Sequence, residues 1–338
     1  MTKFSGTCLH TIRAGILFIS TLFLMSCATV ASSNSYQATI SPEGFQGNEF
    51  MNLRLQGSLA ISGARVKGLP VVELSDLAWD ADANTLYAIS DDGYLYQMKL
   101  SIRENRLVKA DIINATRLKG TYKHALKGAA NDPEGLSIRR ASNGNPTDAE
   151  LLISFEGKSR VNRYDLAGNY LGDVALPKHL LNRHNYRHGN KMLESVAIHP
   201  KHGVIVAAEL PLKSNPVQQQ SVYAQNGKVW NFPRFEAPES SITALESLPN
   251  GDVLVLERAW SGLFSPLVIS LRQLQVNRCD NTQQCSVKDL AVFSTGDGWN
   301  VDNFEGLTHL SGNQYLMVSD DNKSPLQQSL LVLFEILP

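Results

Sequence analysis

A short unit that predicts two paired strands recurs five times along the chain, and this repeat limits the possible folds more than any other feature. Its clearest copy spans residues 301–322, where Glu305 precedes one apolar run, a polar turn follows, and Asp320 ends a second run. Such runs are typical of an antiparallel hairpin. The start of the first strand and the end of the second lie at the same edge, so we expect the two carboxylates to approach each other.

The other copies begin near residues 74, 131, 191 and 241. The opening positions are assigned to Asp76, Glu134, Glu194, Thr243 and Glu305, and the closing positions to Asp91, Glu156, Glu209, Glu257 and Asp320. The two positions are 14 or 15 residues apart, except in the second copy, where an insertion makes the separation 22. Successive openings are 49 to 62 residues apart, which suits a four-stranded blade.

These spacings predict a single all-β domain, a β-propeller of five blades, or of six if a degenerate blade forms from the two ends of the chain. The remaining sequence agrees, because its apolar runs are short, end at Gly, Asn, Asp or Pro, and lack long helical periodicity. We expect the run at residues 330–337 to pair with a strand near residues 53–61 and close the ring. The propeller is assigned to residues 51–338 and a tether to residues 28–50.

The first 27 residues are predicted to be a bacterial lipoprotein signal peptide. Lys3 and Arg13 are basic, residues 14–25 form an apolar run, and Cys27 follows Ser26. The run is too short to span a bilayer, although an uncleaved anchor is the alternative. A lipidated Cys27 would hold a soluble body at a membrane, and we expect membrane contact only through this anchor. Residue 28 is not Asp, which resembles lipoproteins of the Gram-negative outer membrane, so a periplasm-facing location is predicted.

Cys279 and Cys285 are the two cysteines of the predicted folded body, and they enclose five polar residues. In an exported chain this spacing predicts a disulfide across a turn. A zinc site is the alternative, but no second Cys or His pair lies nearby at the spacing of zinc ligands. We therefore assign the two cysteines to loop stability.

The charge balance argues against nucleic acid as a partner. The chain has 31 Lys and Arg against 32 Asp and Glu, and without Lys3 and Arg13 the balance is 29 against 32, a net charge of minus three. No basic footprint for a phosphate backbone remains. The sequence does not predict an oligomeric state.

Four short strings resemble a known family. DPEGL at residues 132–136, LER at 256–258, NFEGL at 303–307 and SDDN at 319–322 occur in the order found in the bacterial family named for the esterase-like activity of phytase. The resemblance covers roughly residues 59–338 and implies an exported β-propeller related in architecture to calcium-dependent alkaline phytases. It does not imply a particular reaction. Where the family's third copy reads FEGLA, this chain has Ser195 in place of the Gly that allows close backbone approach.

The carboxylates are predicted to gather at one mouth of the central channel, where equivalent hairpin ends of a propeller meet. Crowded carboxylates in a partly desolvated channel either hold protons or neutralise a cation. Oxygen ligands without cysteine or clustered histidine favour calcium or magnesium, and calcium accepts irregular geometry. We predict a calcium site. Its candidate ligands are Asp76, Asp91, Glu134, Glu156, Glu194, Glu209, Glu257, Glu305 and Asp320. The alternative is that these side chains accept backbone N–H bonds or pair with Arg258, Arg160 and Lys158.

Two further segments have features of ligand-binding loops. Residues 80–84 imitate the start of an EF-hand loop, but Thr85 replaces its Gly and the closing Glu is missing, so a plain turn is predicted. Residues 182–190 are rich in basic side chains, which we expect to meet an anionic substrate such as a phosphate unless this is only a solvated loop. The candidate substrate-binding residues are Arg183, His184, Arg187, His188 and Arg258.

The sequence favours hydrolysis assisted by a metal over nucleophilic catalysis. It has no G-x-S-x-G elbow and no H-E-x-x-H helix. In the predicted reaction a divalent cation polarises a phosphoester or carboxylic ester and a carboxylate acts as base. Glu305, Glu134 and Asp320 are the candidate catalytic residues. The alternatives are a non-catalytic ligand- or protein-binding propeller and a calcium-dependent lactonase, for which Asn303 and Asn322 are candidate ligands.

Overall fold

The computed structural model describes residues 34–338 with the exception of residue 64, and residues 33–338 form one compact unit. The predicted signal peptide, including Cys27, lies outside the described residues. Nearly all regular secondary structure of the described chain is β-strand. It also has four short 3-10 helices, η1 (Gly128–Ala130), η2 (Lys178–Leu181), η3 (Arg183–Asn185) and η4 (Thr295–Asp297). None of its helices has the length and apolar character needed to cross a membrane.

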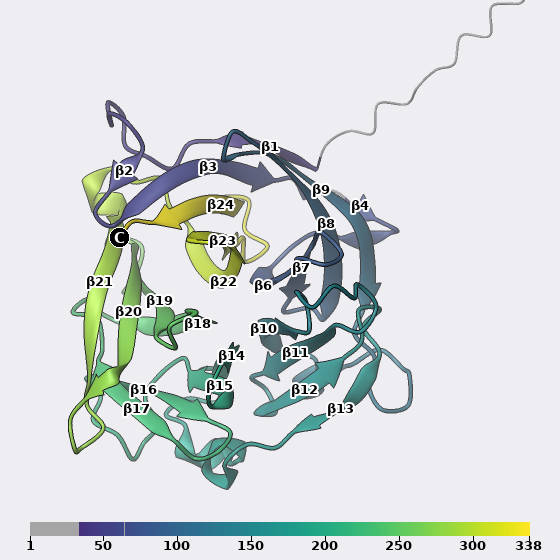
Figure 1. The fold of residues 1–338 in the computed structure, drawn as a ribbon, viewed down its shortest axis with the longest axis vertical. Coiled ribbons are helices and arrows are strands. Elements are labelled where there is room, and N and C mark those ends of the chain that lie inside the picture. Colours follow the sequence, from purple (N-terminus) through teal and green to yellow (C-terminus); the bar gives the residue numbers. More distant parts are fainter. Residues whose placement is uncertain (1–33, 64) are drawn as a thin grey trace, which may run out of the picture. The chain divides into compact units, whose positions relative to one another are not determined.

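Five antiparallel sheets are arranged around a central axis as the blades of a β-propeller (Figure 1). In blades 1 to 4 the four strands follow each other in sequence order from the axis outward. Blade 1 contains β6 (Leu74–Asp80), β7 (Thr85–Ser90), β8 (Tyr94–Arg103) and β9 (Arg106–Arg117). Blade 2 contains β10 (Pro133–Arg139), β11 (Glu150–Phe155), β12 (Arg160–Tyr164) and β13 (Tyr170–Val174). Blade 3 contains β14 (Leu193–His199), β15 (Gly203–Ala208), β16 (Gln219–Ala224) and β17 (Val229–Pro233). Blade 4 contains β18 (Ser241–Ser247), β19 (Val253–Ala259), β20 (Val268–Cys279) and β21 (Cys285–Ser294).

Blade 5 closes the ring with strands from both ends of the described chain. It contains β22 (Asn303–Ser311), β23 (Gln314–Asp320), β24 (Ser329–Ile336), β3 (Leu53–Ile61) and β1 (Ser35–Ala38), with β2 (Glu49–Phe50) on β3. β24 pairs with β3 along its length. The predicted closure is therefore confirmed, and because both ends share one sheet the number of blades is five. A separate hairpin is formed by β4 (Arg65–Val66) and β5 (Leu69–Pro70).

The expected tether ends earlier than the sequence analysis placed it. β1 pairs with β3, and Ile40 is buried in the core between blades 4 and 5. Residues 35–50 therefore belong to the propeller, which corrects the boundary at residue 50. The predicted disulfide between Cys279 and Cys285 is present and links the ends of β20 and β21.

The core lies between neighbouring blades, because each strand supplies apolar side chains to both faces of its sheet. In β23, Leu316 packs toward blade 1 and Met317 toward blade 4. In β15, Ile205 packs toward blade 4 and Val206 toward blade 2. This packing holds the five inner strands in a ring and fixes the positions of the groups at their ends.

Candidate functional site

A β-bulge near the start of every inner strand positions the first set of site residues. The register of each inner strand shifts by one residue against its neighbour at this point. A bulged residue leaves the ladder and its side chain is re-aimed. The bulge positions are held by Ser75, Glu134, Glu194, Thr243 and Glu305.

The second set of site residues lies at the end of the strand that pairs with each inner strand. Each of them is opposite the residue two positions before the bulge. Backbone hydrogen bonds or strand pairing give the equivalent partners, for example Asp132 with Glu156 and Asn303 with Asp320. This second set is Asp91, Glu156, Glu209, Arg258 and Asp320.

The structure differs from the sequence alignment by one residue in two blades. In blade 1 the bulge holds Ser75, and Asp76 follows it; in blade 4 the register places Arg258 in the second set, and Glu257 precedes it. Successive side chains of a strand point to opposite faces, so a slip of one residue moves a carboxylate to the other side of the sheet.

The two carboxylates displaced by this slip have structural partners. Glu257 forms an ion pair of 2.7 Å with Arg272 and is 1 % exposed. Asp76 accepts backbone N–H bonds from Leu77 (2.8 Å), Leu136 (2.6 Å) and Leu307 (2.9 Å), which joins blades 1, 2 and 5. We therefore remove Asp76 and Glu257 from the candidate metal ligands.

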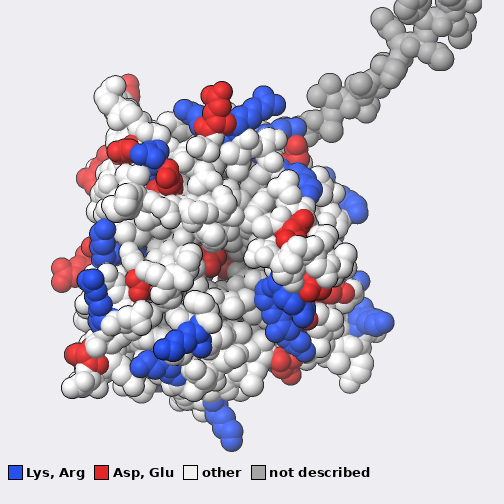
Figure 2. Space-filling view, in the orientation of Figure 1, with Lys and Arg blue, Asp and Glu red and all other residues white. Residues whose placement is uncertain are grey.

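The other seven predicted carboxylates remain as the candidate site, named the carboxylate ring. Its members are Asp91, Glu134, Glu156, Glu194, Glu209, Glu305 and Asp320. In the space-filling view, acidic residues are visible inside the central opening of the propeller (Figure 2). At the opposite end of the inner strands, a cavity of about 420 Å³ is lined by residues such as Trp79, Ile138 and Glu246.

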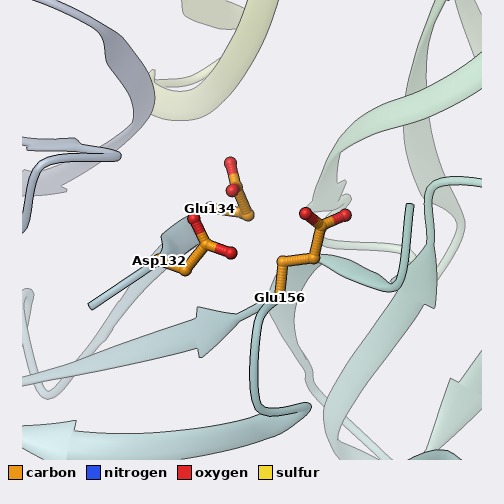
Figure 3. A group of neighbouring side chains, drawn as sticks. All are labelled: Asp132, Glu134 and Glu156. Atoms are coloured by element: carbon orange, nitrogen blue, oxygen red, sulfur yellow. The ribbon is translucent and has the colours of Figure 1, made fainter. Parts of the chain in front are cut away.

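At blades 2 and 3 there are two groups of three carboxylates whose oxygens lie within 4.8 Å of one another, and all of their members except Asp132 belong to the ring. One group is Asp132, Glu134 and Glu156, whose side chains surround a common space (Figure 3). The other is Glu156, Glu194 and Glu209, so Glu156 belongs to both. Asp132 was missed by the sequence analysis, although it begins the string DPEGL.

Two members of these groups lack a partner that would compensate their charge. Glu194 is 7 % exposed, and among the described residues its carboxylate has neither a hydrogen bond nor an ion pair. The Glu134 carboxylate, which is half-buried, also has neither among the described residues. In contrast, Glu156 accepts the Met192 N–H at 2.8 Å, and Glu209 pairs with Lys191 at 2.7 Å. A buried carboxylate without a partner is costly unless it holds a proton or contacts a cation.

The pKa values of the ring are shifted upward accordingly. Burial, followed by the charges of Asp91 and neighbouring glutamates, raises the pKa of Glu134 well above its ordinary value. Burial and the charge of Glu209 do the same for the pKa of Glu194. Burial raises the pKa of Glu156 to about 7, and burial together with Glu305 raises the pKa of Asp320 to about 8. The ring therefore retains protons near neutral pH when no cation is bound.

Arg258 pairs with two carboxylates of the ring. Its guanidinium donates to Glu209 and to Glu305, both at 3.2 Å, and to the side-chain oxygen of Asn303. Asn303 in turn donates to Glu305 at 2.7 Å. Of the predicted charge partners, Arg258 does pair with the ring, whereas no ring carboxylate forms an ion pair with Arg160 or Lys158 in the described structure. Within the described structure, Asp91, Glu156 and Asp320 accept hydrogen bonds from neutral donors, whereas Glu134 and Glu194 at blades 2 and 3 have neither a hydrogen bond nor an ion pair.

The remaining predicted residues are placed as follows. Residues 81–84 form a turn between β6 and β7. Arg183, His184 and His188 are exposed in the connection between β13 and β14. Arg187 binds the backbone carbonyls of residues 211 and 215, which gives it a structural role. The Asn322 N–H donates to Asp320 at 2.8 Å.

The fold and this site define an all-β propeller with an acidic central channel. The family model described as "Phytase-like: Esterase-like activity of phytase" matches residues 69–323, more than half of the chain, and the protein belongs to this family. The comparison with curated proteins finds no match.

Among solved structures, the chain is similar to the crystal structure of the Cps50 (Swd1) β-propeller domain of Myceliophteria thermophila. The identity is 9%, the match covers 90% of this chain and 98% of that chain, and the TM-score is 0.38.

Proposed function

We propose that this protein is a metal-dependent hydrolase of a phosphoester or carboxylic ester, anchored by lipidated Cys27 to the outer membrane and facing the periplasm. Membership of the family described by esterase-like activity supports the reaction class. The observation that carries the metal dependence is the buried Glu194 carboxylate, which faces Glu156 and Glu209 and has neither a hydrogen bond nor an ion pair among the described residues.

The residues between blades 2 and 3 fit a calcium ion. The ligand atoms of both groups are carboxylate oxygens, without sulfur or imidazole nitrogen, which suits a hard cation with an irregular shell. We assign Asp132, Glu134, Glu156, Glu194 and Glu209 as the residues that hold it. A bound cation there supplies polarisation of the scissile group and activation of water.

The rest of the ring is assigned to substrate positioning and proton transfer. Arg258 is held by Glu209, Glu305 and Asn303, and 24 % of its side chain is exposed, so it is available to an anionic group of the substrate. The pKa of Asp320 is raised to about 8 by burial and Glu305. Because its Oδ1 accepts the Asn322 N–H, its Oδ2 is the atom assigned to exchange a proton near neutral pH.

The test is an assay of the mature protein on p-nitrophenyl phosphate, short p-nitrophenyl esters, phytate and simple lactones, with calcium and with chelator. We expect calcium-dependent turnover of an ester or phosphoester. Asp320→Asn should lose turnover but retain calcium binding. If there is no turnover and chelator leaves thermal stability unchanged, both the hydrolase and the metal site are contradicted. Calcium-dependent stability without turnover would instead identify a binding propeller, and turnover of lactones alone a lactonase.

The proposed location has its own test. Replacing Cys27 by serine in the full chain removes the thiol that would carry the lipid. The variant should move from the outer-membrane fraction to the soluble periplasmic fraction. An unchanged distribution would contradict the anchor without affecting the hydrolase assay.

A further inference from the structure

The exposed apolar side chains of the loops are concentrated on one face of the propeller. The inner strands begin at the carboxylate ring, so the connections between blades and the loops between the second and third strands lie on that side, here named the mouth face. Its exposed large apolar residues are Tyr122, Leu181, Val217, Trp260, Leu263, Phe264 and Leu326. In the described chain, the one other such residue outside a strand is Met51.

Three of the four most exposed of these residues lie in the loops that follow Arg258 and Asp320. Leu263 is 84% exposed and Phe264 100%, both in the loop that follows β19 and Arg258. Leu326 is 91% exposed in the loop that follows Asp320. That loop is held to Asp302 by hydrogen bonds from Gln327 and Gln328. Two loops of the neighbouring blades 4 and 5 therefore present large apolar groups to solvent on the mouth face.

The same face carries basic side chains in two segments without a single acid. Residues 118–131 and 175–193 contain no Asp or Glu. Their exposed cations include Lys123, Lys127, Lys178 and Arg183. Apolar and aromatic groups interspersed with Lys and Arg are the composition of protein surfaces that rest on anionic membranes. The acidic ring lies inside the channel, where its charge is shielded from such a surface.

A flat bilayer fits this surface better than a small ligand does. The apolar residues come from two connections between blades and from loops of blades 3, 4 and 5, so they surround the mouth instead of lining one groove. The described chain also begins on the mouth face. Ser329 follows the mouth-face loop between β23 and β24 and pairs with Ile61, and Ile61 pairs with Ser35 at the start of β1. Only residues 28–33 separate the proposed anchor at Cys27 from the described body, a reach of about 20 Å.

We propose that the mouth face docks on an anionic lipid bilayer, with Leu263, Phe264 and Leu326 inserted among the headgroups and the basic segments in contact with them. This inference goes beyond the proposed hydrolase function and does not require turnover. It also revises the expectation that the lipid anchor alone contacts the membrane. The channel mouth then faces the bilayer, so its substrates are drawn from molecules at the membrane surface.

The test uses the body that begins at Ser33, which is a compact unit by itself. It is sedimented with vesicles of phosphatidylcholine alone and of phosphatidylcholine mixed with phosphatidylglycerol. We expect binding that favours phosphatidylglycerol and weakens with salt. The double change Leu263→Asp and Phe264→Asp should lower the vesicle-bound to free ratio by about tenfold or more. The double change Lys123→Glu and Lys127→Glu should weaken binding to the vesicles that contain phosphatidylglycerol and leave binding to pure phosphatidylcholine vesicles unchanged.

The matched control is the double change Val108→Asp and Ile113→Asp, which places the same two charges on exposed apolar residues of the outer strand β9; Ile113→Asp alone is compared with Phe264→Asp alone. Both controls should bind vesicles as the unchanged body does, and all variants should unfold at similar temperatures. Absence of vesicle binding, or an equal loss in the matched control, would overturn the proposal. Self-association without vesicles that is lost in Phe264→Asp would identify a second copy as the occupant. An altered ester preference with unchanged vesicle binding would assign the rim to substrate instead.

Discussion

At the scale of single residues, the partners of a buried carboxylate separate a ligand from a structural group. Glu257 is matched by Arg272, whereas Glu194 is surrounded by other carboxylates. Sequence position does not distinguish them, because both were assigned to the same repeated pattern. Their responses to loss of charge should be opposite.

We predict that Glu194→Gln stabilises the cation-free protein at neutral pH by about 1–3 kcal/mol, because folding no longer requires Glu194 to take up a proton that the unfolded chain has lost. It should weaken calcium binding by about tenfold or more, since even changes outside the ligand shell commonly cost that much. Thermal unfolding in chelator and calorimetric titration measure the two effects.

Glu257→Gln is the matched variant and should lower the free energy of unfolding by about 2–4 kcal/mol, since it leaves the Arg272 charge buried with a weaker partner. Its calcium affinity should stay unchanged. If Glu194→Gln destabilises the cation-free protein as Glu257→Gln does, Glu194 is a structural carboxylate and the metal assignment fails.

At the scale of elements, the strand pairs of the fold could be predicted but their register could not. The recurrence of hairpins gave the blades, and the run at residues 330–337 identified the closing strand. The sequence did not show the exact register in blades 1 and 4, because Ser75 and Asp76 are both polar, as are Glu257 and Arg258. A hydrophobic pattern of period two fixes a register only where the residues on the two faces differ.

The residue that follows the bulge packs against the next blade, and this gives a test within blades 2 and 3. A Cβ at Gly135 would lie 2.7 Å from the Glu194 carbonyl oxygen and 2.8 Å from the Ser195 Cα. Gly135→Ala should therefore destabilise the propeller by about 1–3 kcal/mol. This chain has Ser195 where the resembled family has Gly, and the bulge at Glu194 is present nevertheless.

Ser195→Ala is the matched change in the neighbouring blade. The Ser195 hydroxyl is buried without a hydrogen-bond partner, so its removal should be neutral or stabilising by up to about 1 kcal/mol. Chemical denaturation compares the two variants. A destabilised Ser195→Ala protein would show that the hydroxyl has a partner in solution.

Asp76 connects three blades, and its role can be tested with an isosteric change. In Asp76→Asn one carboxylate oxygen becomes an amide that faces a backbone N–H from Leu136 or from Leu307. We expect a loss of about 2–4 kcal/mol in the free energy of unfolding. Asp297→Asn, an exposed change in η4 (Thr295–Asp297), is the control and should be neutral. Calcium affinity that fell while stability stayed constant would return Asp76 to the metal site.

At the scale of the whole molecule, ring closure concentrates negative charge at one place. Closing blade 5 with β3 brings Glu305 and Asp320 to the same channel as Glu134 and Glu194. The core packing between blades stabilises this arrangement, while repulsion within the ring opposes it. The stability of the propeller should therefore depend on how many ring carboxylates are ionised.

The sign of this dependence follows from the raised pKa values. Burial and Glu209 raise the pKa of Glu156 from 4.5 to about 7, so between these pH values the unfolded chain has lost a proton that the folded chain retains. Stability then falls as pH rises through this window, by roughly 3 kcal/mol for Glu156 alone. Asp320, with its pKa raised to about 8, extends the window upward.

We therefore predict that, in chelator, the melting temperature falls between pH 5 and pH 8. Calcium should raise it, and by more at pH 8 than at pH 5, because the cation replaces protons on the ring. Glu156→Gln should flatten the pH dependence measured in chelator and reduce the calcium increment. A melting temperature that rises over this range in chelator, or a calcium increment equal at both pH values, would show that the ring carboxylates are already compensated within the protein.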